Sequence, residues 1–306
     1  MKGKVKYYLS HSFREGGKVH KIRKLLGSDL AGDVLEDRKK KAERLILDEV
    51  GRYRVVRDPL REELSGEEID FVKGLEREAD LKVAHLSDKE WKVFSKLFTY
   101  NTNAIEGSSL TSKEVEGIID RDDWPRDRSR DDIAEAYGVD EAIGFIRETD
   151  EELSIELIKK IHRMVFRNSK DFAGEFRKRG EEVVVRAASG RVIHEGAPQP
   201  RVVSLLKELV KWYRKYRGKY SGLILAAVVH NQFENIHPFA DGNGRVGRIL
   251  MNNILMKNRL SPVNIALRHS VEYYATLTEY SKNKNIRPTI VFLLKEYKNT
   301  RKSLKG

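Results

Sequence analysis

Apolar residues recur every three to four positions over most of this chain, and that spacing predicts α-helices from Pro59 nearly to the C-terminus. Three capping boxes, each a Ser or Thr followed three residues later by Glu, predict helix starts. They are Ser65 with Glu68, Ser87 with Glu90, and Thr111 with Glu114. Further helices are predicted over residues 133–147, 153–166 and 202–216. Two strongly apolar segments, 223–229 and 249–255, predict a pair of buried helices.

Two stretches break the helical spacing and predict β-hairpins. Near the N-terminus, residues 4–9 and 18–26 flank Gly16-Gly17, a dipeptide typical of tight turns. An amphipathic helix is predicted over residues 33–50. Within the helical part, two runs of β-branched residues flank Ser189-Gly190 and predict an inserted hairpin. The runs consist of Val183, Val184, Val185, Val192 and Ile193.

The predicted fold is therefore all-α, with an inserted β-hairpin and a small N-terminal α+β extension. We divide the chain into this extension, a helical segment, a core and a short tail. These parts comprise residues 1–62, 63–120, 121–300 and 301–306.

The composition excludes several classes of function. The 306 residues contain no cysteine, which excludes a disulfide framework, a thiolate metal site and a thiolate nucleophile. No apolar run approaches the length of a membrane span, and the N-terminus lacks the apolar core of a signal peptide. We therefore expect a cytoplasmic protein that does not enter a membrane.

Positive charge is concentrated near the N-terminus. The chain has a net charge of +12, and residues 1–62 hold 17 Lys and Arg against 10 Asp and Glu. This extension could bind nucleic acid, dock an acidic protein, or simply cover the core with a solvated face.

The loop between the two apolar helices, His237 to Arg248, concentrates the candidate chemistry of the chain. A loop that leads directly into a helix leaves backbone N–H groups without helical partners, and the helix dipole adds positive charge there. Gly242 and Gly244 let this backbone approach a ligand closely. Arg245 and Arg248 lie three residues apart, on one face of the predicted helix. Together these features predict a phosphate-binding site.

His237 and Asp241 add reactive groups beside the phosphate site. Histidine is suited to taking a proton from an attacking hydroxyl at neutral pH, and one carboxylate with phosphate oxygens is enough to hold Mg²⁺. Nucleotidyl transfer from a nucleoside triphosphate to a hydroxyl uses all of these parts. A zinc site is disfavoured because a third ligand is lacking, and His230 is more typical of a buried structural histidine. The G-x-G-x-x-G spacing lacks the strand and the acidic residue of a dinucleotide site.

The same residues carry a resemblance to a known family. Residues 237–248 match the Fic motif, H-P-F-x-[DE]-G-N-G-R-x-x-R, at every defined position. The resemblance extends over roughly residues 90–297 and includes residues 174–177 and Tyr273-Tyr274. It implies a Fic-fold helical core in which the inserted hairpin is a flap that docks the target.

The resemblance implies AMP transfer from ATP to a Ser, Thr or Tyr hydroxyl of a target protein. His237 would be the general base, with Asn243 and Arg245 as further catalytic positions, and Asp241 would hold Mg²⁺. The phosphates would be bound by Gly242, Asn243, Gly244, Arg245 and Arg248, the last of them at the γ-phosphate. The flap would hold the target by strand addition. Gly at position 244, where Doc-like kinases of the superfamily have Lys, favours AMP transfer over phosphorylation.

A second motif lies upstream of the loop. Residues 102–107 resemble the family's inhibitory motif, [ST]-x-x-x-E-[GN], with Thr102, Glu106 and Gly107 at its defined positions. A plain helix end, with Gly107 as the terminating residue, is the alternative. In the inhibitory interpretation Glu106 pairs with Arg248 and takes the place of the γ-phosphate. The chain then resembles a self-inhibited, class II Fic protein.

Other functions stay open at this point. The chain could be a nucleic-acid-binding regulator that uses the loop as a nucleotide sensor and residues 1–62 as its binding surface. It could also remove AMP from a modified protein, since a glutamate at position 106 can orient a water. Ser281 replaces an adenosine-contacting Asn of many relatives, which leaves Asn283 or Asn285 as a substitute. The target and the oligomeric state are open, with a homodimer as one alternative.

Overall fold

The structure is a computed structural model, and it describes residues 4–15, 18–57, 64–78, 86–181, 183–186 and 192–305. The chain divides into two compact units, Met1–Asp58 and Pro59–Gly306. Across the described parts of the chain, no helix combines the length and the apolar character that a membrane crossing requires.

The first unit is an antiparallel hairpin followed by one helix. Strands β1 (Lys6–Glu15) and β2 (Lys18–Ser28) are paired, with a register shift between Tyr7 and Tyr8. Helix α1 (Gly32–Arg57) follows. Side chains of all three elements form a small apolar core, made of Leu9, Phe13, Ile22, Ile46 and Val50. The predicted hairpin and helix are confirmed, and the helix continues beyond residue 50; the predicted turn at Gly16-Gly17 lies outside the described residues.

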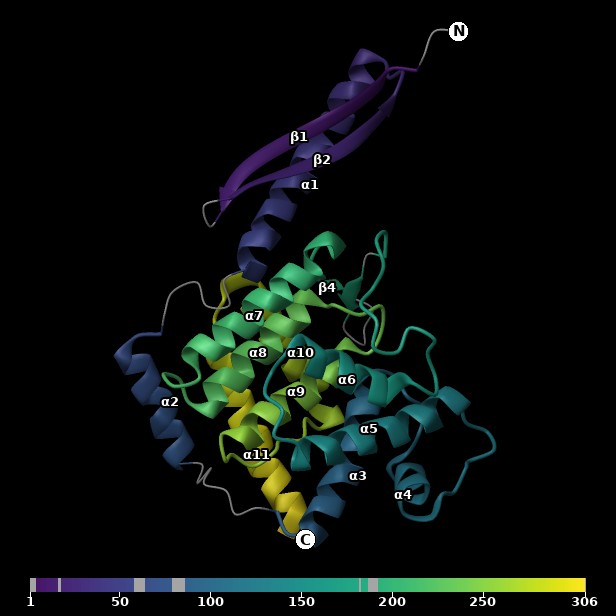
Figure 1. Cartoon of the computed structure of the whole chain (residues 1–306), viewed down its shortest axis with the longest axis vertical. Helices are drawn as coiled ribbons and strands as arrows, with labels where there is room; N and C mark the ends of the chain where they lie inside the picture. The colour runs from purple at the N-terminus through teal and green to yellow at the C-terminus, as the bar shows by residue number, and fades with distance from the viewer. Residues whose placement is uncertain are drawn as a thin grey trace. The chain divides into compact units, whose positions relative to one another are not determined.

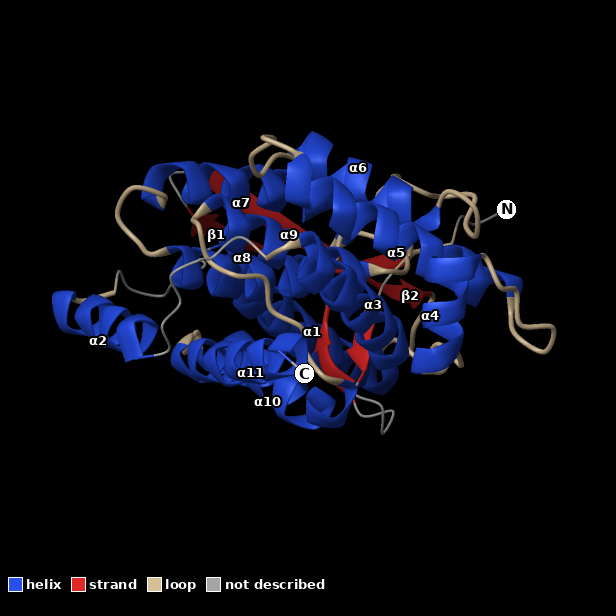
Figure 2. Cartoon of the chain, turned by 90° about the horizontal axis from the view of Figure 1, so that it is seen from below, coloured by secondary structure: helices blue, strands red, loops and turns tan. Residues whose placement is uncertain are grey.

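The second unit is helical, apart from the inserted hairpin (Figures 1 and 2). The helices before the hairpin are α2 (Gly66–Glu78), α3 (Asp88–Ile105), α4 (Ser112–Arg121), α5 (Arg130–Glu148) and α6 (Ile155–Phe166). Those after it are α7 (Val202–Tyr216), α8 (Gly222–Ile236), α9 (Asn243–Lys257), α10 (Ser270–Asn283) and α11 (Arg287–Lys305). Because α11 continues to Lys305, the residues predicted to form a tail are largely part of this helix.

The predicted helix starts are present. Ser87 and Thr111 form complete capping boxes at the starts of α3 and α4. At Ser65, before α2, the backbone N–H donates to Glu68 at 2.9 Å and the hydroxyl accepts from the Glu68 N–H at 3.2 Å. Each box satisfies N–H groups that a helix start would otherwise leave without partners.

Helices α8 and α9 form the centre of the second unit. Every residue of α8 is buried, and so is α9 from Asn243 to Leu255. The two helices pack on each other, and α3, α5, α6, α7, α10 and α11 contact one or both of them (Figure 1). Burial on all sides explains why these segments are apolar around the whole helix rather than along one stripe. The loop that joins them is therefore held between two rigid elements.

The inserted hairpin is confirmed as two short antiparallel strands, β3 (Val184–Arg186) and β4 (Val192–Glu195). Val184 pairs with Glu195 and Val185 with His194, and the register shifts before Arg186. Val183 immediately precedes β3. The predicted turn at Ser189-Gly190 lies outside the described residues.

Candidate active site

The loop between α8 and α9 has a well-defined backbone conformation. His237 ends α8 with a left-handed φ of 51°, and Gly242 begins α9 with a φ of 80°. Asn243 ties the loop together, since its Oδ1 accepts from the Phe239 N–H at 2.9 Å and its Nδ2 donates to the Phe239 carbonyl at 2.9 Å. The buried Asn243 therefore shapes the loop that carries the other candidate residues.

The start of α9 has the features of an anion site. No side chain caps this helix, so its first N–H groups lack partners within the helix and the positive end of the dipole is exposed to a ligand. The Glu106 carboxylate lies beside it, because a Cβ added to Gly244 would be only 2.0 Å from Glu106 Oε1. The glycine at 244 thus allows an anionic group to come this close.

Arg248, in the second turn of α9, is held by α3. Its Nη2 donates to Glu106 Oε1 at 2.7 Å and to the Thr102 carbonyl at 3.0 Å, and its Nε donates to Thr102 Oγ1 at 2.8 Å. The Arg248 side chain is 1% exposed and that of Glu106 26%. Glu106 also terminates α3, and Gly107 follows with a φ of 97°. The second motif is thus a helix end whose carboxylate binds Arg248.

Arg245 is held by a different helix. Its Nη1 forms an ion pair with Glu135 of α5, and both side chains are almost fully buried. Its Nη2 lies 3.4 Å from Asp241 Oδ1, and its guanidinium lies 4.5 Å from the centroid of the Phe166 ring. Ser169 Oγ donates to Glu135 at 3.0 Å. The two arginines, predicted to share one face, therefore reach carboxylates on two separate helices.

His237 is oriented through the backbone. Its Nδ1 lies 3.2 Å from the Glu234 carbonyl oxygen, which assigns the proton to Nδ1 and makes Nε2 the accepting nitrogen. The His237 carbonyl accepts from Arg177 Nε at 2.9 Å, and the Arg177 N–H donates to the Pro238 carbonyl at 3.0 Å. Arg177 Nη2 also donates to the Ala197 carbonyl, just after β4. Arg177 thus joins the loop to the base of the hairpin.

Asp241 offers an accessible carboxylate at the start of α9, with its side chain 48% exposed. Its Oδ1 accepts from the Gly242 N–H at 2.6 Å. His162 of α6 holds the backbone: its Nδ1 accepts from the Gly174 N–H at 2.8 Å, so its Nε2 donates to the Asp241 carbonyl at 3.2 Å. Burial lowers the pKa of His162 to about 4, so the ring is neutral near pH 7, as this pattern requires.

These contacts leave Asp241 suited to one kind of metal site. Among the described residues, no three His, Asp or Glu side chains gather as a protein-only metal site would need. Mg²⁺, however, is commonly bound by one or two carboxylates with phosphate oxygens. A single exposed carboxylate beside a phosphate-binding helix start fits that donor set.

The Fic/DOC family model matches residues 152–255, which include α6, α8, the loop and most of α9. The chain carries a domain of the Fic/DOC family. The chain is 30% identical over 205 residues to protein adenylyltransferase fic-1 of Caenorhabditis elegans, covering 65% of this chain and 39% of that protein. Protein adenylyltransferase Fic of Nematostella vectensis is 30% identical over 203 residues, covering 63% and 45%. The chain thus spans less than half the length of these relatives.

Solved structures share the fold of the Fic domain. A Fic family protein from Desulfovibrio desulfuricans superposes with a TM-score of 0.66 at 22% identity, over 80% of this chain and 76% of that one. Fic-1 from C. elegans superposes with a TM-score of 0.63 at 23% identity, over 90% and 78%. The predicted all-α Fic fold with an inserted hairpin is confirmed.

Several residues that support the Fic loop were not singled out from the sequence. Glu135 gave one usable signal, since it is a charged residue inside the buried side of α5. His162 likewise lies on the apolar face of α6. Arg177 belongs to a segment that resembles the family, but nothing in the sequence showed that its side chain reaches His237.

The asparagines considered for adenosine binding are engaged locally. Asn283 Nδ2 donates to Glu279 Oε2 at 3.0 Å, and Asn285 Oδ1 accepts from the Arg287 N–H at 3.2 Å. Their substitution for the family's Asn at Ser281 stays a prediction.

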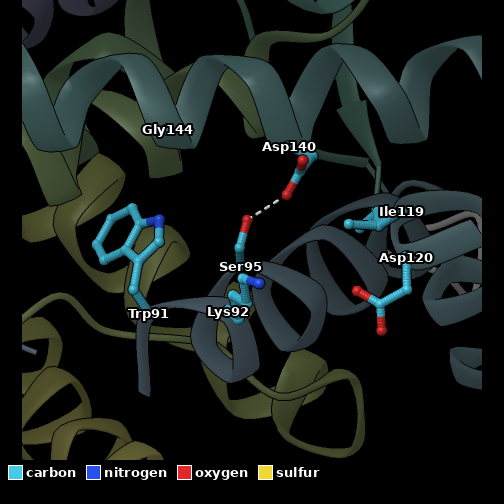
Figure 3. Close-up of a pocket in the computed structure, with 7 residues that line it drawn as sticks. All are labelled: Trp91, Lys92, Ser95, Ile119, Asp120, Asp140 and Gly144. Carbon is cyan, nitrogen blue, oxygen red and sulfur yellow. Dashed lines mark hydrogen bonds between the residues drawn. The ribbon is translucent and has the colours of Figure 1, made fainter. Parts of the chain in front are cut away.

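A pocket of about 320 Å³ lies outside the Fic loop, between α3, α4 and α5 (Figure 3). It is lined by Trp91, Lys92, Ser95, Ile119, Asp120, Asp140 and Gly144. Its two carboxylates are already engaged, Asp140 by the Ser95 hydroxyl and Asp120 by Lys96 Nζ at 2.7 Å. Both carboxylates of the pocket therefore already have partners within the protein.

Proposed function

We propose that this chain is a protein adenylyltransferase that transfers AMP from ATP to a hydroxyl side chain of a target protein, and that Glu106 holds it inactive. The observation that carries the proposal is the Glu106 carboxylate at the start of α9, paired with the buried Arg248. A helix start and a buried arginine together favour the polyphosphate of a nucleotide. The names of the C. elegans and N. vectensis relatives support the same activity.

His237 is the proposed general base. Its Nε2 takes the proton of the target hydroxyl as the hydroxyl oxygen attacks the α-phosphorus of ATP. The bond between the α-phosphorus and the bridging oxygen breaks, and pyrophosphate leaves. Donation from Nδ1 to the Glu234 carbonyl fixes the tautomer that this step needs. A general base of this kind contributes roughly 10²–10⁴-fold to the rate.

The start of α9 is the proposed phosphate site. The N–H groups of Asn243 and Gly244 bind phosphate oxygens, that of Gly242 joins them once it has left Asp241 Oδ1, and Arg248 binds the γ-phosphate once Glu106 has moved away. Asp241 would hold Mg²⁺, which would neutralise phosphate charge when bound. Arg245 contacts both Glu135 and Asp241, and these contacts keep the Asp241 carboxylate in place.

The flap is the proposed docking element for the target. In the described part of the chain, β3 and β4 form a two-stranded sheet, so each strand has an edge that a target peptide could extend by strand addition. Arg177 ties the base of this flap to the His237 carbonyl, which fixes the distance between docked peptide and base.

Autoinhibition follows from the position of Glu106. Its carboxylate and a γ-phosphate cannot both occupy the space beside Gly244 and pair with Arg248. ATP that binds without this partner is displaced from the geometry of in-line attack, and a displacement of ~1 Å can lower the rate by ~10²-fold.

The test is label transfer from radiolabelled ATP to proteins of a cell extract. Glu106→Gly should label a target that the unmodified chain labels weakly, and adding His237→Ala should abolish the signal. His269→Ala, which removes a histidine bound to Glu296 instead of the loop, is the matched control and should keep it. Equal labelling with and without His237 would refute its role as base. Parallel reactions with CTP, GTP and UTP test the preference for ATP.

Nucleic-acid binding by the first unit is a second candidate, favoured by the outer face of its hairpin. Four exposed basic side chains lie on alternate positions of β1 and β2: Lys6, Arg14, Lys21 and Arg23. Neither 6–14 nor 19–28 contains a carboxylate, and Arg23 lies 3.7 Å above the Tyr8 ring. Basic side chains interleaved with an aromatic ring suit a nucleic-acid strand.

This candidate predicts salt-dependent binding of an RNA or DNA oligonucleotide to the full chain. The double variant Lys21→Glu, Arg23→Glu should weaken it strongly and flatten its dependence on salt, because fewer counterions are released. If neither salt nor the double variant changed the affinity for the oligonucleotide, this candidate function would be excluded.

A further inference from the structure

A second carboxyl group lies behind the proposed base. Glu234 precedes His237 by one helical turn in α8 and is 3% exposed. Its Oε2 lies 3.8 Å from His237 Nδ1, the same nitrogen that donates to the Glu234 backbone carbonyl at 3.2 Å. The backbone carbonyl oxygen and the carboxyl oxygen of Glu234 therefore both face Nδ1 of His237, whereas Nε2 is the nitrogen that takes the proton.

Helix α9 provides the space for this carboxyl group. A Cβ added to Gly247 would lie 2.5 Å from Glu234 Oε1, so a side chain at 247 would displace the carboxyl group. Gly247 occupies a position that the Fic motif leaves undefined. The close approach of Glu234 gives a physical reason for glycine here. The next residue is Arg248, so the carboxyl group lies beside the same turn of α9 that holds the inhibitory pair.

Among the described residues, the titratable groups around Glu234 come from four helices. They are His230 and His237 of α8, Arg248 of α9, Tyr273 and Tyr274 of α10, and Glu106 of α3. Burial lowers the pKa of His230 to about 3 and raises the pKa of both tyrosines, so these three groups are neutral near pH 7. From the described residues outside α8, the two charges that bear on Glu234 are therefore Arg248 and Glu106.

These two charges act in opposite directions. Burial raises the pKa of Glu234 to about 8; Arg248 opposes that shift and Glu106 adds to it. With Glu106 in place, Glu234 is mainly protonated at neutral pH. In the nucleotide-free protein, removing the Glu106 carboxylate takes away the charge that opposes Arg248, and the ionised form of Glu234 becomes more populated.

We propose that Glu234 is a positioning residue for His237, whose side chain holds the ring and stabilises the imidazolium that forms during the reaction. The proposal rests on AMP transfer with His237 as the base.

The role of Glu234 follows from the proton balance of the step. The O–H bond of the target breaks, the N–H bond at His237 Nε2 forms, and the imidazolium now carries a proton on both nitrogens. An ionised Glu234 beside Nδ1 stabilises this cation, whereas a protonated one does not. The proton later leaves Nε2 to water, and Glu234 exchanges no proton with the substrate.

The test compares Glu234→Gln with its parent in the Glu106→Gly background. The amide keeps the shape of the side chain and removes its charge. We expect kcat to fall by about 10- to 100-fold, the effect typical of removing a carboxylate that orients a functional histidine, while the Kd for ATP stays unchanged. The rise of kcat as Glu234 ionises with increasing pH should disappear. Glu296→Gln, a buried carboxyl group on α11 that binds His269, is the matched control and should change neither.

A second readout does not depend on catalysis. NMR titration of the His237 ring in the Glu106→Gly background should show protonation at higher pH with Glu234 present than in Glu234→Gln. If the ring titrates identically in both, the coupling between the two residues is refuted whatever the activity. If Glu106→Gly labels a target and Glu234→Gln labels it equally at every pH, this inference fails while AMP transfer stands. If Glu106→Gly labels nothing, the proposed function fails and the catalytic role of Glu234 fails with it.

Discussion

The two arginines of α9 are both paired with carboxylates, yet the two pairs are built differently. Arg248 is paired with Glu106, the terminal residue of α3, whose side chain is 26% exposed. Arg245 is paired with Glu135, inside α5, whose side chain is 7% exposed and also accepts from Ser169. A carboxylate at a helix end can swing away, whereas one inside a packed helix cannot.

The difference assigns separate tasks to the two pairs. A partly exposed carboxylate can exchange for a phosphate at small cost, because water and the incoming anion replace its partners. Separating a buried pair leaves an uncompensated charge, which typically costs about 3–5 kcal/mol. We therefore regard Glu106–Arg248 as the exchangeable contact, and Glu135–Arg245 as the fixed support of Asp241.

The largest effect is expected for Arg248→Ala in the Glu106→Gly background. This variant removes the proposed partner of the γ-phosphate, and an arginine in this role contributes about 10³-fold or more. Rates of AMP incorporation from labelled ATP measure the effect. Arg147→Ala, which removes an arginine bound to Asp88 far from the loop, is the control. A fall limited to a few-fold would show that Arg248 does not contact the reacting nucleotide.

How much of this could be predicted from the sequence depends on the distance over which residues act. The Fic loop is a local motif, so His237 and Asp241 could be identified from adjacent letters. Glu106 could be identified because residues 102–107 resemble the family's inhibitory motif. Glu135 could not, since its contact with Arg245 arises only when α5 packs on α9.

The same limit applies to the residues that support His237. Glu234 lies in the apolar helix α8, close to the motif. Its approach to His237 depends on the left-handed φ of His237, which the sequence does not show. Arg177 reaches the loop only because the chain returns after α6 and the hairpin. Backbone geometry and chain reversal are not encoded in the spacing of single residues.

Glu135→Gln breaks the fixed pair. The amide is almost the same size, but it leaves the buried Arg245 with only the longer contact to the half-exposed Asp241, and we expect the free energy of unfolding to fall by about 3 kcal/mol. Urea denaturation measures this change. Glu141 also lies on α5, and its exposed carboxylate pairs with Arg167. Glu141→Gln should lower the free energy of unfolding by less than about 1 kcal/mol. Equal effects of the two variants would contradict the contrast between buried and exposed pairs.

A pH-dependent loss of stability tests the support of Asp241 from α6. The pKa of His162 is lowered to about 4 by burial, so the unfolded chain binds the proton first. The contribution of His162 is complete above its ordinary pKa near 6.5 and is lost as the pH falls toward 4, by about 3 kcal/mol. Glu234 acts in the opposite direction, because its raised pKa makes the folded state bind a proton first.

The contribution of His162 is therefore measured as the difference in stability between the unmodified chain and a His162 variant. We expect His162→Asn to be less stable at pH 7 and to lose less stability than the unmodified chain between pH 6.5 and 4, as followed by thermal unfolding in matched buffers. Parallel curves for the two proteins would mean that folding leaves the pKa of His162 unchanged, which would contradict this account.

The smallest effect is expected at Thr102, which supports the exchangeable pair from the side. Thr102→Val removes the acceptor of Arg248 Nε and should lower the free energy of unfolding by about 1.5 kcal/mol, the value for a hydrogen bond to a charged group. Thr278→Val, whose hydroxyl bonds only the neutral Tyr274 carbonyl, should have a smaller effect. If Thr278→Val lowered the free energy of unfolding more than Thr102→Val, the contact between Thr102 and Arg248 would contribute little to stability.

The central claim is that the Glu106–Arg248 contact, and not the other pair, keeps AMP transfer off. Its most direct test is the initial rate of AMP incorporation from labelled ATP for the unmodified chain, Glu106→Gly and Glu135→Gln, measured side by side on the same protein extract. We predict an increase of about 10²-fold for Glu106→Gly and no increase for Glu135→Gln. A Glu106→Gly variant that binds ATP yet is no faster than the unmodified chain would contradict the account.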